Sequence, residues 1–187
     1  MKILVAGIPK SGTMLLWNSL DESERAKTHL FPDAQCSIEG KKIDSSYRVV
    51  FLFGDPVLSV ISTYRTCNQS EQWMLAHAKH CDCNKEISEI DIINRDDFHY
   101  ERMFDEWTTT DKFEVLCLRY ETLYENIDIL ETFVGRKLNL PPWKKRQTTY
   151  NDVSPEVLNK IKETYAALIN KVNKFPDYKW RCYGIDQ

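Results

Sequence analysis

Short, unbroken apolar runs alternate along the chain with longer segments in which apolar residues recur at helical spacing. The clearest runs cover residues 2–6, 48–53 and 113–118. Runs of this length without polar alternation are typical of strands that are buried on both faces of a parallel sheet. Residues 96–109 instead place large apolar side chains on one helical face, which predicts an amphipathic helix.

Capping signals indicate where further helices begin and end. Pro56 follows Asp55 at an early helical position, where its missing N–H costs nothing, and Ser154 is a preferred N-cap residue. Gly135 ends a helix that begins near Thr122. The predicted helices are 14–20, 55–65, 96–109, 122–134 and 154–172, with a polar helical excursion at 67–83; residues 25–30 are expected to be extended and the tail from 175 irregular.

The order of these elements predicts the fold class. Strands separated by helices indicate an α/β fold with a central, mostly parallel sheet. We expect a three-layer sandwich with a P-loop-like strand–loop–helix at the N-terminus. The chain has no internal repeat and no linker, so residues 1–187 are expected to form a single domain.

Composition narrows the classes of function. A net charge of -3 argues against a general nucleic-acid binder, whose signature is a strong basic excess. No apolar run approaches the roughly 18–20 residues that span a bilayer, and the apolar start is too short for a signal peptide. We therefore expect a cytoplasmic protein with no membrane partner and no nucleic-acid partner.

The cysteines suggest no structural framework. All six are irregularly spaced, and in a reducing compartment they are expected to be mostly free thiols, although a disulfide within residues 67–83 stays open. Side chains of zinc-ligand type gather in the same region. They lack paired C-x-x-C spacing, so we expect no metal site from Cys67, His77, His80, Cys81 and Cys83.

A glycine-containing loop joins the first predicted strand to the first predicted helix. Gly7 and Gly12 bound this loop, and Lys10 lies between them. Backbone N–H groups and the helix dipole favour anions at such a place, so the loop is a candidate phosphate site. The ATP-binding pattern G-x-x-x-x-G-K-[ST] needs a lysine where Thr13 stands. A magnesium- and ATP-dependent small-molecule kinase is therefore an alternative that the position of Lys10 argues against.

Residues 9–13, with the sequence PKSGT, resemble the 5′-phosphosulfate loop P-K-S-G-T-T-W of the PAPS-dependent sulfotransferases. The resemblance implies a sulfotransferase that takes a sulfuryl group from PAPS and releases PAP. No metal is implied, since a sulfuryl group carries less charge than the phosphoryl group whose transfer usually needs Mg²⁺. The resemblance makes Lys10 the residue that stabilises the transferring group, and it assigns donor binding to Pro9, Lys10, Ser11, Gly12, Thr13 and Met14.

The next predicted strand carries a candidate base. Its residues 27–30, with the sequence KTHL, resemble a segment of the same family in which the histidine takes the proton of the acceptor. The resemblance thus makes His29 the general base and places Lys27 near the reacting centre. Imidazole suits this role because it titrates near neutral pH. The other histidines, His77, His80 and His99, lie in polar stretches and are expected at the surface.

Residues 51–64 resemble the family segment R-[DN]-P-x-D-x-x-x-S-x-Y, which binds the 3′-phosphate of the donor. In register, Ser62 would contact that phosphate through its hydroxyl. Gly54, however, stands where the family has an arginine, and an arginine fork is the natural phosphate partner. The candidate substitutes are Arg65, which follows Ser62 by three residues on a predicted helix, and the basic residues Lys144, Lys145 and Arg146.

The resemblance continues through the C-terminal half in the order of the family. Residues 115–126 resemble its strand-to-helix passage, which would place Tyr120 near the adenine. The chain is short for this family, and residues 67–89 are the best candidate for contact with the acceptor, a small molecule or a glycan. The sequence leaves the oligomeric state open. The loss of arginine at Gly54 also keeps a third hypothesis open, a non-catalytic nucleotide-binding relic.

Overall fold

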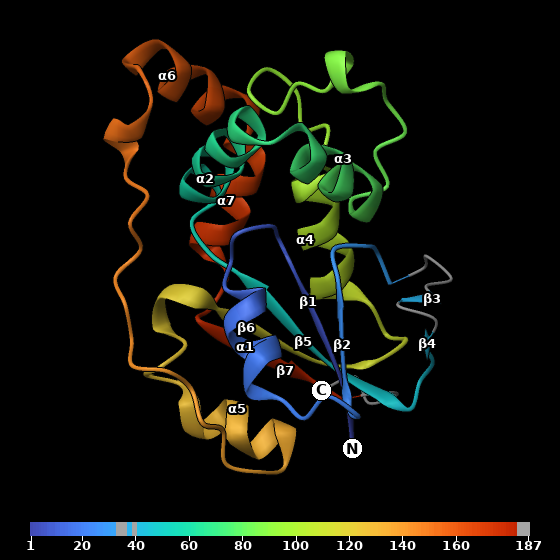
Figure 1. Ribbon diagram of the computed structural model, residues 1–187. Helices are drawn as coiled ribbons and strands as arrows, with labels where there is room; N and C mark the ends of the chain where they lie inside the picture. The colour runs from blue at the N-terminus through green and yellow to red at the C-terminus, as the bar shows by residue number, and fades with distance from the viewer. Residues whose placement is uncertain (33–36, 39–40, 183–187) are drawn as a thin grey trace.

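The computed structural model describes residues 1–32, 37–38 and 41–182. Its main sheet has five strands in the order β2-β1-β5-β6-β7 (Figure 1). Neighbouring strands are parallel except for the last pair, β6 and β7. The strands are β1 (Lys2–Gly7), β2 (Arg25–Thr28), β5 (Tyr47–Phe53), β6 (Glu114–Arg119) and β7 (Tyr178–Arg181), and a separate hairpin pairs β3 (Ser37–Ile38) with β4 (Lys41–Lys42).

Seven α-helices and three 3₁₀ turns connect these strands within the described residues. The α-helices are α1 (Thr13–Ser19), α2 (Pro56–Gln69), α3 (Glu71–His80), α4 (Tyr100–Thr109), α5 (Ile127–Val134), α6 (Pro155–Thr164) and α7 (Ala166–Lys174). The 3₁₀ turns are Ile87–Glu89, Tyr120–Thr122 and Tyr150–Asp152. Among the described residues, none of these helices combines the length and the apolar character that crossing a bilayer requires.

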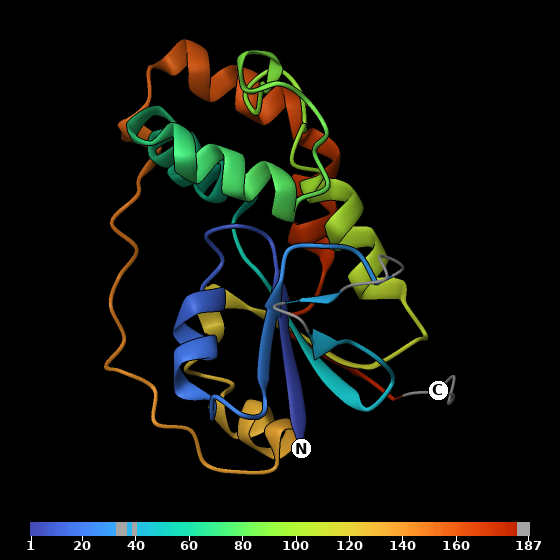
Figure 2. The same cartoon turned by 45° about the vertical axis from the view of Figure 1, so that its right-hand side comes forward.

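Two hydrophobic cores flank the sheet, one on each face. Along β5, Val49, Phe51 and Phe53 belong to one core, while Val50 and Leu52 belong to the other. Figure 2 shows α1 and α5 covering one face and α4 with α7 covering the other. Burial on both faces explains why β5 is an unbroken apolar run. The prediction of an α/β fold with a mostly parallel sheet is therefore confirmed, and the arrangement is compatible with three layers.

The structure corrects several predicted boundaries. The tail is not irregular up to residue 182, because Tyr178–Arg181 form the antiparallel edge strand β7. Helix α4 begins at Tyr100 rather than at residue 96, since His99 has a φ of 55°. The helix predicted at 122–134 is a 3₁₀ turn followed by the shorter α5. The helix predicted at 154–172 is divided between α6 and α7 at Tyr165.

The cysteine prediction is confirmed for the part of the chain that the structure describes. Five thiols are free, and four of them are buried. Cys36 lies outside the described residues. No three His, Cys, Asp or Glu side chains among the described residues are gathered in a way that could hold a metal ion.

The connections of the sheet mark one edge as a place for a ligand. The connection that leaves β1 leads to β2 on one side, whereas the connection that leaves β5 leads to β6 on the other side. The order of the strands therefore reverses between the carboxyl ends of β1 and β5, where Gly7 pairs with Leu52. In open α/β sheets, ligands bind outside the carboxyl ends of strands at such a switch point. Helices α2, α3 and α6 lie beyond this edge (Figure 2).

Candidate functional site

The loop between β1 and α1 is built around two glycines that no other residue can replace without movement. A Cβ atom at Gly7 would lie 2.6 Å from the carbonyl oxygen of Leu52 and 2.7 Å from Cγ2 of Thr13. Gly12 has a φ of 85°, and a Cβ there would lie 2.3 Å from the ring of Tyr120. The first glycine lets β5 approach the loop, and the second lets the backbone turn beneath an aromatic ring.

Ser11 fixes the loop from inside. Its hydroxyl group is buried, and Oγ lies 2.6 Å from the carbonyl oxygen of Ile8 and 2.8 Å from that of Leu52. These bonds hold the Ser11 side chain inside the loop. Pro9 and Thr13 are also buried, so these three residues shape the loop through their backbone.

The start of α1 presents backbone donors toward the loop. The first N–H groups of a helix have no acceptor within that helix. Here the N–H groups of Leu15 and Leu16 bond to the carbonyl oxygen of Gly12. The N–H groups of Thr13 and Met14 precede these bonds and have no acceptor in the part of the chain that the structure describes. They can donate to an anion in the loop.

Lys10 supplies the cation of the loop and stands in a strained backbone position. Its φ is 66°, a conformation that costs energy for any residue other than glycine. Its ammonium group lies 4.4 Å from the ring centroid of Trp73 on α3, a cation–π contact. Burial lowers the pKa of Lys10 from its ordinary value. The side chain is thus held beneath α3 rather than extended into open solvent.

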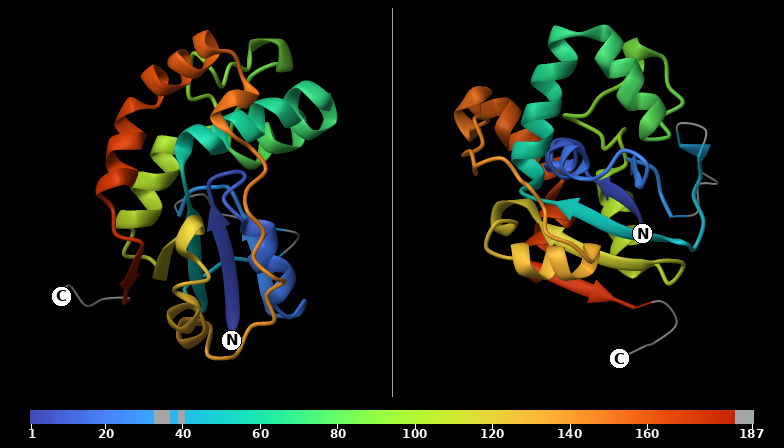
Figure 3. Two further views of the ribbon diagram at one scale, coloured as in Figure 1. Left: turned by 90° about the vertical axis from the view of Figure 1, so that its left-hand side faces the viewer. Right: turned by 60° about the horizontal axis from the view of Figure 1, so that its bottom comes forward.

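Arg146 reaches this loop from the other end of the sequence. Residues 136–149 form an extended segment that runs from α5 to α6 along the outside of the molecule (Figure 3). From this segment, Nη2 of Arg146 donates to the carbonyl oxygen of Lys10 at 2.7 Å. The guanidinium also lies 5.4 Å from the ring centroid of Tyr120, which itself covers Gly12. The structure thus brings together Lys10, Tyr120 and Arg146, all predicted as donor-binding residues.

His29 lies directly beside the same loop. It follows β2, which pairs with β1, and its ring is 3% exposed. Nδ1 lies 2.5 Å from the carbonyl oxygen of Gly7, so Nδ1 carries the proton and Nε2 is the basic nitrogen of the neutral ring. Burial lowers the pKa of His29 to about 4, despite the opposing effect of the Gly7 carbonyl. The imidazole is therefore neutral at physiological pH.

Sequence reasoning missed two side chains of α3. His77 was expected at the surface, but it is partly buried, and its ring lies 5.5 Å from that of His29. Trp73 stacks on His77 with 3.5 Å between centroids, one helical turn away. Burial and the neighbouring His29 lower the pKa of His77 to about 3. The only sequence signal for this stacked pair was the spacing of four positions between the two aromatic residues.

Lys27 and Met14 form the outer side of the site. Lys27 lies on β2 opposite Val5 of β1, and its ammonium group is 3.3 Å from the sulfur of Met14. Met14 is 47% exposed at the start of α1. Lys27 thus lies two residues before His29, on the strand that pairs with β1.

The turn after β5 differs from the loop after β1. A Cβ atom at Gly54 would lie 2.8 and 2.9 Å from the two carboxylate oxygens of Glu121. Glu121 also accepts a hydrogen bond from the N–H of Asp55 at 3.0 Å. A carboxylate thus fills the space into which a side chain at position 54 would extend, and nothing in the sequence indicated this.

The proposed substitutes for the missing arginine have different partners. Arg65 forms an ion pair with Asp152. Ser62 is partly buried on α2, and its carbonyl oxygen accepts a bond from the hydroxyl of Thr66. Arg146 bonds to the first loop instead of this turn. Within the described residues, no hydrogen bond or ion pair joins Ser62, Arg65 and Arg146 to one another.

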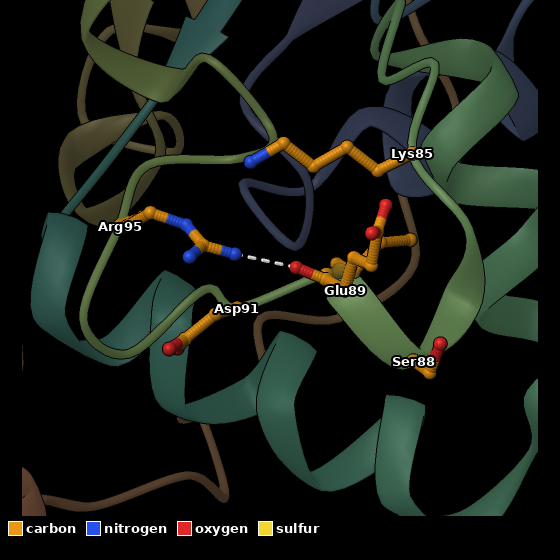
Figure 4. Close-up of a pocket in the computed structure, with 6 residues that line it drawn as sticks. Lys85, Ser88, Glu89, Asp91 and Arg95 are labelled. Atoms are coloured by element: carbon orange, nitrogen blue, oxygen red, sulfur yellow. Dashed lines mark hydrogen bonds between the residues drawn. The ribbon is translucent and has the colours of Figure 1, made fainter.

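Cavities in the described part of the chain also lie outside the first loop. One of about 470 Å³ adjoins Asp55, which accepts a bond from the hydroxyl of Tyr150, and its apolar floor includes Val57 and Ile169. Burial and this bond raise the pKa of Tyr150 to about 12. Another cavity, of about 580 Å³, is shown in Figure 4. Its cations are engaged within the fold, because Lys85 and Arg95 both pair with Asp97.

In comparisons with known proteins, the chain matches no protein-family model and no curated protein sequence.

Proposed function

We propose that this chain is a sulfotransferase, in which a P-loop-like strand–loop–helix holds the 5′-phosphosulfate group of a nucleotide donor of the PAPS type. One observation carries the proposal. Lys10, His29 and Arg146 come from three distant parts of the sequence and meet at a single glycine loop. Their chemistry is that of an anion site with a cation, a neutral base and a second cation beside it.

The loop fits the 5′ end of such a donor. The N–H groups of Thr13 and Met14 and the ammonium of Lys10 would hold the phosphosulfate oxygens. Arg146 holds the Lys10 carbonyl and so keeps the loop in its turned conformation. The donor, when bound, supplies a sulfuryl group whose bond to the phosphate oxygen breaks as a bond to the acceptor oxygen or nitrogen forms.

His29 can take the proton that the acceptor loses. Its Nδ1–H bond to the Gly7 carbonyl fixes the ring and leaves Nε2 as the proton acceptor. Because burial keeps the imidazole neutral, the base is in its active form at physiological pH. Lys10 balances the charge that develops on the leaving phosphate. Trp73 and His77 form an aromatic wall beside both groups and are the proposed contact for the acceptor.

The experiment is a two-stage assay. Calorimetry with PAP and with 5′-AMP first tests nucleotide binding, and transfer of labelled sulfate from PAPS and from adenosine 5′-phosphosulfate to a panel of phenols, amines and sugars then tests catalysis. We expect binding and transfer without added metal. Binding with no transfer to any acceptor would favour the nucleotide-binding relic, and binding of only ATP with Mg²⁺ would favour the kinase.

A further inference from the structure

The carboxyl end of β5 carries negative charge at the place where the family resemblance requires an arginine. Both carboxylate oxygens of Glu121 lie within 3 Å of the position of a Cβ atom at Gly54. The carboxylate is held there by the N–H of Asp55. Its location therefore follows from a specific hydrogen bond rather than from an arbitrary orientation of a surface side chain.

A second carboxylate reinforces the first. Asp55 caps α2 by accepting from the N–H of Leu58, and its other oxygen accepts from the hydroxyl of Tyr150. These bonds leave the negative charge of Asp55 in place, since both donors are neutral. Arg65 of α2, the candidate substitute for the missing family arginine, forms an ion pair with Asp152. The turn after β5 thus offers two carboxylates to a ligand, while the cations Arg146 and Lys162 lie farther out, near Tyr150.

A nucleotide whose 5′-phosphate is bound in the first loop would extend beside the carboxylates of Glu121 and Asp55. Tyr120 covers Gly12 of the loop, and the next residue, Glu121, bonds to Asp55 at the end of β5. β1 and β5 are neighbours in the sheet, so the two turns share one edge. A ribose attached to a 5′-phosphate in the loop therefore lies beside Glu121 or Asp55.

We propose that the donor site is selective for a nucleoside 5′-phosphosulfate without a 3′-phosphate, because Glu121 and Asp55 place negative charge at the turn to which the resemblance assigns the 3′-phosphate. This inference rests on the proposed function and narrows its donor. Carboxylates repel a phosphate dianion and accept hydrogen bonds from ribose hydroxyl groups. The free 3′-hydroxyl of an adenosine 5′-phosphosulfate suits this turn, whereas the 3′-phosphate of PAPS does not.

The test compares two non-reacting nucleotides on the same protein. Calorimetry at low salt measures the Kd of 5′-AMP and of PAP, which differ only in the 3′-phosphate. We expect about tenfold weaker binding of PAP. The difference should shrink at high salt, because exposed charges are screened. PAP binding tighter than 5′-AMP binding would overturn the inference and leave sulfuryl transfer intact.

A charge-neutral variant tests whether the charge of Glu121 causes the selectivity. Glu121→Gln keeps an oxygen that can accept from the Asp55 N–H, so the turn should stay folded. We expect it to tighten PAP binding clearly and to weaken 5′-AMP binding only slightly, because the amide oxygen can still accept from a ribose hydroxyl, so most of the gap closes. Asp111→Asn removes a carboxylate that precedes the amino end of β6, at the opposite ends of the strands from the two turns. It should leave both Kd values unchanged. An unchanged gap in Glu121→Gln would contradict the assignment.

The same titrations separate failure of the inference from failure of the proposed function. If neither nucleotide binds the wild-type protein, the donor site itself is absent, and both proposals fall. If both bind and PAP binds more tightly, only the donor selectivity falls. Thermal unfolding of Glu121→Gln, measured beside the wild type, checks that a changed Kd reflects charge rather than loss of folded protein.

Discussion

The loop after β1 and the turn after β5 share one edge of the sheet but have opposite electrostatic character. The first gathers Lys10, Arg146 and the N–H donors at the start of α1. The second gathers the carboxylates of Glu121 and Asp55. We therefore propose that anions bind at the first turn. At the second turn, where Asp55-Pro56 and Ser62 match the family pattern, the side chain at position 54 that would pair with a phosphate is missing.

The two turns also differ in how their glycines are used. Gly12 is required by its φ of 85° and by the ring of Tyr120 above it. At Gly54 the space for a side chain is occupied by the end of a flexible glutamate. Gly12 is needed for the backbone conformation, whereas Gly54 leaves room for the negatively charged carboxylate of Glu121. Substitutions at the first turn should therefore have the larger effects.

Removal of the cation from the first loop is the largest perturbation. Lys10→Ala should lower kcat for sulfuryl transfer by about 10³-fold, the effect of losing one positioned donor at a developing charge. A radiolabel transfer assay at saturating donor measures this. Lys160→Ala removes an exposed ammonium from α6 and is the control that should keep the wild-type rate. A wild-type kcat in Lys10→Ala would exclude this lysine from the reaction.

Gly12→Ala should break the backbone of the same loop. The left-handed conformation and the clash with Tyr120 together should lower the free energy of unfolding by about 3 kcal/mol. Gly135→Ala is a matched control, because its φ is 76° but the nearest atom to its Cβ lies 3.3 Å away on flexible Met1. It should lose only about 1 kcal/mol. Equal losses in denaturant titrations would show that Tyr120 does not constrain the loop.

Loss of the candidate base should affect turnover but not donor binding. His29→Asn should lower kcat by about 10²-fold, because it removes proton transfer and leaves Lys10 and the loop N–H groups in place. The Kd for 5′-AMP should stay at the wild-type value. Lys79→Ala, which changes an exposed lysine of α3, should leave both quantities unchanged. A parallel loss of donor affinity in His29→Asn would assign the ring a structural role.

The pH profile sharpens the same assignment. The neutral form of His29 is the base, and burial lowers its pKa to about 4. kcat/KM should therefore be constant from neutral pH downward and fall only as the pH approaches 4. If the base were an exposed histidine, this acidic fall of kcat/KM would occur at a pH of about 6.5. A limb near neutral pH that disappears in His29→Asn would show that the ring is far less buried during the reaction.

The smallest expected effect is that of the second cation. Arg146→Ala removes the bond to the Lys10 carbonyl and one charge beside the loop, so binding of 5′-AMP should weaken about tenfold. The adjacent, exposed Lys145 provides the control, since Lys145→Ala removes the same charge without that bond. Calorimetry distinguishes the two. Equal weakening in both variants would indicate a general charge effect instead of a specific contact.

Much of the fold could be predicted because it depends on local pattern. The strands β1, β5 and β6 are buried on both faces and are therefore unbroken apolar runs. Strand β7 was missed because it is an exposed edge with an aromatic and basic sequence, which lacks that signal. The break at Tyr165 between α6 and α7 follows from tertiary packing, since its hydroxyl reaches the carbonyl oxygen of Ile92.

The candidate site was predictable only where a motif lies within one loop. Lys10 and Gly12 follow from such a motif, and His29 follows from the next strand. The positions of Trp73, His77 and Glu121 depend on how distant elements pack, so no local pattern could place them. The ion pair of Arg65, a candidate phosphate partner, was not foreseeable for the same reason, because it joins Arg65 to Asp152, 87 positions away.

A crystal structure of the protein with bound 5′-AMP tests the central claim most directly. We predict that the 5′-phosphate lies in the loop after β1, within hydrogen-bond distance of the Lys10 ammonium and the N–H groups of Thr13 and Met14. The ribose should lie beside Glu121. A nucleotide bound elsewhere, with the loop empty and Lys10 still against Trp73, would contradict the account.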